Sequence, residues 1–378
     1  MTLPETHLQL LSSVSKDGQL EVKLAEKPLP ELEAHQVLVR VEASPINPSD
    51  LGVLFGLSDV GEAASTGDGR ERVLRAPIPP KGMRAMKARV EQSLPVGNEG
   101  AGTVVAAGES ESAQALMGKV VAAMGGGMYA QYRKVDAAAC LVLQEGHTPR
   151  DGASCFVNPL TALSMVETMR LEGHSALIHT AAASNLGQML VRICRDESVG
   201  LVNVVRKAEQ VKLLKELGAE HVVDSSQESF LGDLIEAIHA TGATLAFDAI
   251  GGGSLASSIL MAMEASESRR MKAYSIYGST THKQLYIYGS LDNAPTTLAR
   301  SYGMAWGVGG WLLPNFMARA GREVGARMRA RVAKELKTTF ASHYTDEISL
   351  FDALDADTAR RFQAKKTGQK FLLNPQLG

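Results

Sequence analysis

The chain has 378 residues, 45% of them apolar and 21% charged. It exceeds the ~250–300 residues at which one hydrophobic core stops growing, so we expect two domains. A net charge of −2 without blocks of like charge gives no reason to expect a nucleic-acid partner, and no apolar run reaches the ~20 residues of a membrane span. The three cysteines form no disulfide framework or CxxC pair, and the N-terminus lacks a signal-peptide pattern, which predicts a cytoplasmic protein.

The first 150 residues are predicted to form a β-rich domain. Short alternating segments such as 36–42 and 102–106 are broken by Pro and Gly, with little helical periodicity. Residues 58–93 interrupt this rhythm: they begin rich in Gly, Ser and Pro and become basic and helical from 82 to 91. Long loops in compact domains are often functional. Two interpretations stay open for this insertion: a lid over a substrate pocket, and a surface flap or oligomer contact.

The segment 175–187 has the order of elements that binds a pyrophosphate. An apolar strand over 175–179 is followed by a turn of small residues, and helical periodicity starts at Leu186. Small side chains let the backbone approach a phosphate, and the helix directs its N-terminal amides at the anion. The predicted pyrophosphate site comprises Ala182, Ala183, Ser184, Asn185 and Leu186. Only Gly187 of the usual three glycines is present, so the turn alone is a weak motif.

The next strand, 201–205, ends about twenty residues beyond the turn, where an NAD site would present Asp or Glu to the ribose. Arg206 and Lys207 stand there instead. A guanidinium pairs bidentately with a 2′-phosphate, which indicates NADP rather than NAD. The other interpretation is an ordinary solvated start of the following helix.

The alternation of helix and strand then continues. The predicted helices are 209–217, 230–239 and 255–264, and the predicted strands are 221–224, 244–250, 272–277 and 285–289. This order predicts an α/β domain built on a doubly wound parallel sheet, with 285–289 as its edge strand. Gly251 and Gly278 follow strands at the edge where such sheets bind ligands, although simple turn glycines would look the same.

Seven segments together resemble the medium-chain dehydrogenase/reductase superfamily. They are 41–50 (VEASPINPSD), 94–102 (LPVGNEGAG), 118–122 (GKVVA), 129–132 (YAQY), 158–162 (NPLTA), 217–221 (LGAEH) and 368–373 (GQKFLL). The resemblance implies a GroES-like catalytic domain formed by residues 1–157 and 332–378, with 58–93 inserted. It implies a Rossmann NADP-binding domain at residues 158–331. Relatives commonly pair as homodimers through the Rossmann sheet, which would use strand 285–289.

Within the superfamily the chain is most similar to the zinc-free quinone oxidoreductase branch. Zinc-dependent relatives place a Cys near Ser49 and a His at Asn98, and neither ligand is present, so we expect no metal. Cys155 and His147 are better interpreted as a buried thiol and a loop side chain. The activity implied is hydride transfer from NADPH to a small electrophilic acceptor, a quinone or another α,β-unsaturated carbonyl.

Two alternatives remain. Segments 98–100, 158–162 and 203–206 also resemble enoyl thioester reductases, but those enzymes carry a proton-donating Tyr shortly after the Asn-Pro-Ser-Asp motif, where this chain has Phe55. Tyr288 is a candidate for the role of proton donor in place of that Tyr. An NADPH-binding sensor or structural protein with little turnover is the other alternative.

The resemblance further implies that Asn47 lies near the nicotinamide and that Asn158 and Thr161 lie beside the cofactor. The remaining implied cofactor contacts are Arg206 and Lys207 at the 2′-phosphate, Gly251, Tyr277 and Tyr288 along the adenosine and nicotinamide, Trp311 and Leu312 closing over the nicotinamide, and Lys370 near the 2′-phosphate.

Overall fold

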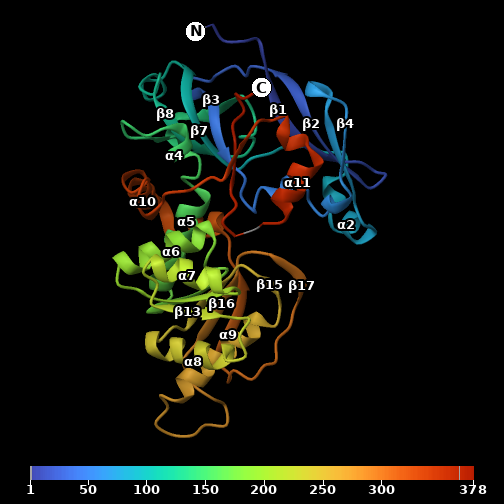
Figure 1. The fold of residues 1–378 in the computed structure, drawn as a ribbon. Coiled ribbons are helices and arrows are strands. Elements are labelled where there is room, and N and C mark those ends of the chain that lie inside the picture. Colours follow the sequence, from blue (N-terminus) through green and yellow to red (C-terminus); the bar gives the residue numbers. More distant parts are fainter. Residues whose placement is uncertain (1, 366) are drawn as a thin grey trace. The chain divides into compact units, whose positions relative to one another are not determined.

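The computed structural model describes residues 2–365 and 367–378. The chain divides into two compact units, unit 1 with Met1–Val157 and Arg331–Gly378, and unit 2 with Asn158–Ala330 (Figure 1). Unit 2 thus covers residues 158–330, whereas the sequence predicted a domain of residues 158–331. Among the described residues, no helix combines the length and the apolar character needed to cross a bilayer.

Unit 1 contains two sheets. The first has the order β4 (Ala64–Thr66), β5 (Val73–Pro77), β2 (Gln19–Pro28), β1 (Thr6–Val14), β6 (Ser93–Pro95). The second has the order β10 (Leu141–Val142), β8 (Val120–Met124), β7 (Glu99–Ala107), β3 (Gln36–Pro45), β20 (Phe371–Leu373), β19 (Asp346–Ile348), with β9 (Tyr132–Asp136) also pairing with β3. The short helices α1 (Leu51–Leu54), α2 (Pro80–Ala85), α3 (Glu111–Gln114), α4 (Pro149–Gly152) and α11 (Ala356–Gln363) lie in the segments that connect these strands or follow them. Because β20 lies between β3 and β19, the end of the chain completes a sheet begun near its start.

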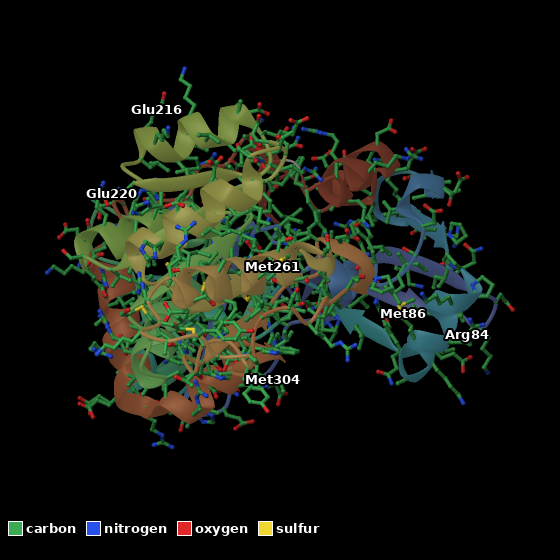
Figure 2. The ribbon with its side chains drawn as sticks, turned by 90° about the horizontal axis from the view of Figure 1, so that it is seen from below. Arg84, Met86, Glu216, Glu220, Met261 and Met304 are labelled. Carbon is green, nitrogen blue, oxygen red and sulfur yellow. The ribbon has the colours of Figure 1, made fainter. Side chains whose placement is uncertain are left out.

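The insertion 58–93 is built into unit 1. Its strand β5 pairs with β2 and with β4. Arg89 donates to the Ser12 hydroxyl at 2.6 Å, and Leu57 N–H points at the Met86 sulfur at 3.3 Å. Arg84 of the same segment is exposed at the surface (Figure 2). The insertion therefore extends the first sheet and packs on its core through specific contacts.

Unit 2 is a six-stranded parallel sheet, which confirms the predicted Rossmann class. Its order is β13 (His221–Asp224), β12 (Gly200–Val205), β11 (Ala176–Thr180), β14 (Leu245–Asp248), β16 (Lys283–Ile287), β18 (Trp306–Gly310). The helices are α5 (Val157–Leu171), α6 (Asn185–Asp196), α7 (Ala208–Glu216), α8 (Phe230–Thr241), α9 (Leu255–Ser268) and α10 (Leu313–Lys334). Gly321, at φ 86°, interrupts α10. Near-continuous apolar runs in β11, β12 and β14 are buried at every residue but Gly200, as a sheet covered on both faces requires.

Two sequence predictions for unit 2 are wrong, and two features of its sheets were not predicted. Residues 272–277 form no strand, and the side chains of Tyr274, Ile276 and Tyr277 are exposed. Strand 285–289 is β16, shifted by two residues and interior, so the sheet ends at β18 instead. A segment with alternating apolar residues forms a strand only where a neighbouring strand can share backbone hydrogen bonds with it. Segment 272–277 has no such neighbouring strand. The Gly-rich strand β18 was not predicted, because glycine weakens strand propensity. The small sheet of β15 (Gly251–Gly253) and β17 (Asp292–Thr296) was not predicted either.

Candidate functional site

The turn after β11 and the start of α6 form the first part of the candidate site. Ser184 caps α6 by accepting a hydrogen bond from Gly187 N at 3.1 Å, and Ala181 has a φ of +50°. A Cβ on Gly187 would come within 2.1 Å of the Ala182 carbonyl oxygen. This close approach of helix to turn is the reason for glycine there. The packing brings the first amides of α6 to the carboxyl end of the sheet, where an anion is stabilised.

Asp248, at the end of β14, organises the neighbouring backbone. Its carboxylate accepts hydrogen bonds from Thr180 Oγ1 at 2.7 Å, Ile250 N at 2.9 Å and Gly251 N at 3.1 Å. Thr180 Oγ1 in turn accepts from Ala249 N at 2.8 Å. These bonds fix Gly251, at φ 80°, relative to the end of β11. Asp248 and Thr180 were not predicted as site residues, although polar residues that end buried strands are a usable sequence signal.

Arg206 and Lys207 follow β12 and are both exposed. Lys207 occupies the N-cap position of α7 and its ammonium lies 3.5 Å from Glu209. Arg206 N donates to Gln210 Oε1 at 3.0 Å, and within the described residues no carboxylate pairs with its guanidinium. The two basic residues therefore differ: Arg206 presents an uncompensated cation at the strand end.

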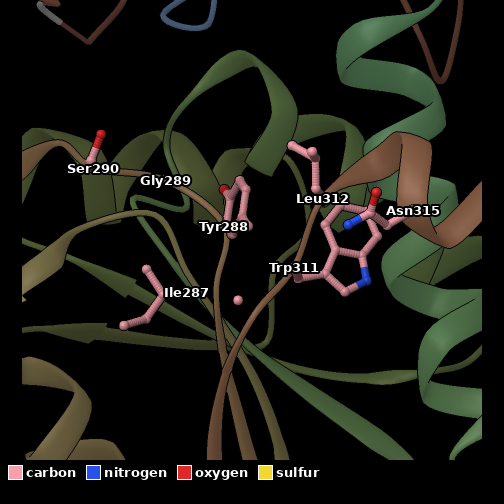
Figure 3. Close-up of a pocket in the computed structure, with 8 residues that line it drawn as sticks. Ile287, Tyr288, Gly289, Ser290, Trp311, Leu312 and Asn315 are labelled. Atoms are coloured by element: carbon pink, nitrogen blue, oxygen red, sulfur yellow. The ribbon is translucent and has the colours of Figure 1, made fainter. Parts of the chain in front are cut away.

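A cavity of about 450 Å³ opens at the carboxyl ends of β16 and β18. It is lined by Ile287, Tyr288, Gly289, Ser290, Gly310, Trp311, Leu312 and Asn315 (Figure 3). The Trp311 indole donates a hydrogen bond to Thr168 Oγ1 at 3.2 Å, and it packs edge-on against Phe247 with the ring centroids 5.6 Å apart. These contacts hold the ring in place within unit 2. Leu312 is exposed. Tyr277, predicted to lie near this site, is exposed and does not line the cavity.

Tyr288 is paired with a buried histidine behind the cavity. Its hydroxyl lies 2.7 Å from His179 Nε2, and the two rings stack at 5.8 Å. Burial lowers the pKa of His179 to about 3 and raises the pKa of Tyr288 well above its usual value. Both groups are therefore neutral at physiological pH. A Tyr engaged with a neutral imidazole in this way is a poor proton donor to an acceptor molecule, which weakens its speculative catalytic role.

Unit 1 holds a separate cluster of buried polar groups around Asn47. Asn47 Nδ2 donates to Glu99 Oε1 at 2.8 Å, and the two Asp50 oxygens accept from Asn47 N and Asn98 N, each at 2.8 Å. Glu99 Oε2 accepts from Phe156 N and Val157 N at 2.8 and 3.0 Å. Burial raises the pKa of Asp50 to about 7 and also raises that of Glu99. Asn158 and Thr161 follow in the first turns of α5.

Lys370 lies in the same unit. Its ammonium donates to Ser154 Oγ at 2.8 Å and to Ser342 Oγ at 3.4 Å, and burial lowers its pKa to about 8. The structure thus engages Lys370 in internal hydrogen bonds, whereas the resemblance implied an ammonium directed at a 2′-phosphate.

No group of three or more His, Cys, Asp or Glu side chains in the described part of the chain is placed to hold a metal ion. At the position where zinc-dependent relatives carry His, Asn98 Nδ2 donates to Ser49 Oγ at 3.1 Å. Cys155 is buried, and burial raises its pKa well above the usual value, so it stays a thiol.

Comparison with known proteins agrees with this architecture. Residues 33–145 match the alcohol dehydrogenase GroES-like domain family, and residues 186–267 match the family described as zinc-binding dehydrogenase. The chain belongs to the medium-chain dehydrogenase/reductase superfamily. A putative NADPH:quinone reductase from Mesorhizobium loti has the same fold, with a TM-score of 0.73, 27% identity, and 99% and 100% of the two chains covered.

Curated members of the superfamily match a smaller share of the chain. The rat (Rattus norvegicus) synaptic vesicle membrane protein VAT-1 homolog is 29% identical over 243 residues, which cover 63% of this chain and 53% of that protein. The mitochondrial enoyl-[acyl-carrier-protein] reductase of Arabidopsis thaliana is 27% identical over 244 residues, 61% of this chain and 56% of that protein. The chain thus spans about half the length of the curated relatives it matches.

Proposed function

We propose that this superfamily member is a zinc-independent, NADPH-dependent reductase of quinones or other α,β-unsaturated carbonyls. The observation that carries the proposal is the uncompensated Arg206 guanidinium after β12. This strand pairs with β11, and the turn that follows β11 packs against Gly187 of α6. A 2′-phosphate is the ligand feature that such a cation matches. The similarity to the Mesorhizobium loti protein supports the choice of acceptor class.

The residues present fit this cofactor. Residues 182–186 and the first amides of α6 would hold the pyrophosphate, Arg206 the 2′-phosphate, and Gly251 with the cavity at Tyr288 and Trp311 the adenosine and nicotinamide regions. When bound, NADPH supplies a hydride. The chain's own residues then have to orient the acceptor and provide a proton. Asn98 stands where zinc-dependent relatives carry His, and no Cys stands at or near Ser49, where they carry one; both differences support chemistry without zinc.

Reduction of enoyl thioesters is the second candidate, favoured by the mitochondrial enoyl reductases among the relatives. Against it, Phe55 is fully buried in the core of unit 1 where a proton-donating Tyr would be needed. We also propose that the protein is a homodimer. Its pairing strand would be β18, the end of the parallel sheet.

Fluorescence titration with NADPH and NADH tests the cofactor. In Arg206→Ala the preference for NADPH should fall by about 1.5–3 kcal/mol, because a charge-assisted pair is lost. Lys212→Ala, an exposed lysine on α7, should bind as the wild type does. Equal binding of both dinucleotides by the wild type would contradict the proposal.

The acceptor class is tested by adding 1,4-benzoquinone, 9,10-phenanthrenequinone or crotonyl-CoA to the NADPH complex. Consumption of a quinone that persists after EDTA treatment supports zinc-independent quinone reduction, and preference for crotonyl-CoA supports the second candidate. Binding without any turnover would favour a sensor or structural role. Light scattering that gives a monomer would refute the dimer.

A further inference from the structure

The cavity at the carboxyl ends of β16 and β18 contains a side-chain amide that has no role so far. Asn315 lies in the first turn of α10, and only two residues separate this helix from the end of β18. Phe316 N donates to Leu312 O at 3.1 Å, and the buried Phe316 ring packs against Trp311 with the ring centroids 6.0 Å apart. These contacts fix the start of the helix, and Asn315 beside Phe316 is exposed and lines the cavity (Figure 3).

The amide of Asn315 is available to a ligand, whereas other polar groups of the cavity are engaged. The Trp311 indole and the Tyr288 hydroxyl are both hydrogen-bonded to neighbouring side chains of unit 2. Among the described residues, no group is hydrogen-bonded to the Asn315 amide, so its acceptor oxygen and its two N–H donors are left for a ligand or water. Ser290 offers a hydroxyl on the opposite side of the view in Figure 3.

The strand order of unit 2 directs one end of an extended dinucleotide to this cavity. The strands β12, β11, β14, β16 and β18 are neighbours in this order and parallel, so their carboxyl ends share one edge. Arg206 follows β12, and the turn that packs on Gly187 follows β11. With the 2′-phosphate at Arg206 and the pyrophosphate at this turn, the other half of the ligand extends past β14 to β16. At ~4.8 Å between neighbouring strands, β16 lies about 10 Å from β11, a distance that one nucleoside covers.

A nicotinamide group has the size and the chemistry that this cavity accommodates. The volume of about 450 Å³ lies within the ~300–1,000 Å³ of ligand pockets, and apolar side chains such as Trp311 and Leu312 suit the face of a pyridine ring. The carboxamide on that ring has one acceptor oxygen and an N–H pair. The Asn315 amide can bond both, because its Oδ1 accepts an N–H while its Nδ2 donates to the oxygen. The Ser290 hydroxyl has a single oxygen and does not match a planar carboxamide in this way.

We propose that Asn315 recognises the carboxamide of the nicotinamide and so determines which substituent on the pyridine ring this site accepts. The proposal rests on the proposed function, which brings NADPH to unit 2. Asn315 takes no part in proton or hydride transfer. It selects the cofactor by hydrogen bonds and holds the ring in one orientation about its bond to the ribose.

Competition between NADP⁺ and its 3-acetylpyridine analogue, measured by calorimetry, tests the proposal without turnover. The analogue carries a methyl in place of the amide nitrogen, so it has no N–H for Asn315 Oδ1. The wild type should bind NADP⁺ about tenfold more tightly, because the analogue leaves that oxygen without a donor. Asn315→Leu, of similar shape but apolar, should bind both equally, and Asn315→Asp, which keeps an accepting oxygen, should keep the preference. Glu323→Gln, exposed on α10 outside the cavity, is the matched control and should behave as the wild type does.

The fragment 2′-phosphoadenosine 5′-diphosphoribose, which lacks the nicotinamide, separates the possible failures. It should bind the wild type and Asn315→Leu with the same Kd, and weaker binding to Asn315→Leu would overturn the proposal, because the residue would then act on another part of the cofactor or on the fold. A wild type without the preference, an Asn315→Leu variant that keeps it, or a Ser290→Ala variant that loses it would also overturn the proposal. If neither NADP⁺ nor the fragment binds the wild type, the proposed function itself fails, and this assignment fails with it.

Discussion

Gly187 is the residue at which α6 passes closest to the turn that precedes it. Every side chain larger than hydrogen would collide with the Ala182 carbonyl, since even a Cβ comes to 2.1 Å. That contact is backbone, so no rotamer change relieves it. The collision forces α6 away from the end of β11, and the amides at the helix start move with it.

Gly187→Ala should therefore weaken NADPH binding at least tenfold and lower the free energy of unfolding by about 1–3 kcal/mol. Urea denaturation and fluorescence titration measure the two effects. Gly232→Ala, on α8 with open space around its Cβ, is the control and should be neutral or slightly stabilising, because alanine favours helix. Unchanged binding in Gly187→Ala would show that the turn is not the phosphate site.

Asp50 makes stability depend on pH. Its pKa is about 7 in the folded protein and 3.8 in the absence of burial, so the folded state binds more protons between these values. By linkage, the contribution of Asp50 to stability declines as the pH rises from about 4 to 7.

Between pH 5 and 8 the free energy of unfolding of the wild type should fall by roughly 2–4 kcal/mol more than that of Asp50→Asn. The side chain of the variant does not titrate. Denaturation at the two pH values measures this, with Asp17→Asn, an exposed carboxylate, as the control. A wild-type and an Asp50→Asn protein with the same pH dependence would mean that the Asp50 carboxyl ionises normally.

Among the elements, those with strong local periodicity were predictable from the sequence. The β11–α6–β12 unit was predicted because apolar runs, a turn of small residues and a 3.6-residue period agree there. Segment 269–282 was not, because its structure depends on a tertiary ion pair. Lys283 is fully buried and donates to Glu264 Oε2 at 2.5 Å and to Ser279 Oγ at 2.8 Å. Likewise Ser154 is hydrogen-bonded to Tyr344 and Lys370, which lie far from it in the sequence, and no local sequence signal indicates this proximity.

Lys283→Met should destabilise the protein by about 3–5 kcal/mol, because it leaves the Glu264 carboxylate buried without its cation. Burial alone would raise the pKa of Glu264, but hydrogen bonds from Lys283 and Ser279 lower it overall. The double variant Lys283→Met, Glu264→Gln should recover part of the loss, since no buried charge remains. Lys272→Met, an exposed lysine, is the control in the same thermal and urea unfolding experiments. A loss below about 1 kcal/mol, the range of solvent-exposed pairs, would show that the pair is hydrated.

The molecule combines unit 2, which is one continuous stretch of the chain, with unit 1, which is built from two separate stretches. Unit 2 is continuous and has its own sheet and apolar core. Unit 1 needs the end of the chain, because β20 pairs with β3 and with β19. The core of unit 1 includes Ile348, Leu350, Leu354, Phe362, Phe371 and Leu373 from that end. Only the family resemblance predicted this return, since hydrophobic pattern does not specify which distant strands pair.

Residues 1–157 expressed alone should therefore fail to fold, because β3 loses a neighbour and the core loses these large apolar side chains, each worth about 1.5–3 kcal/mol when buried. The total of roughly 9–18 kcal/mol is as large as the roughly 5–15 kcal/mol by which a domain is usually stable. Residues 158–330 should fold alone and show a cooperative urea transition by circular dichroism. A chain that joins 1–157 to 331–378 through a flexible Gly/Ser linker is the matched control and should restore folding of unit 1. A cooperative transition for 1–157 alone would show that unit 1 folds without the C-terminal segment.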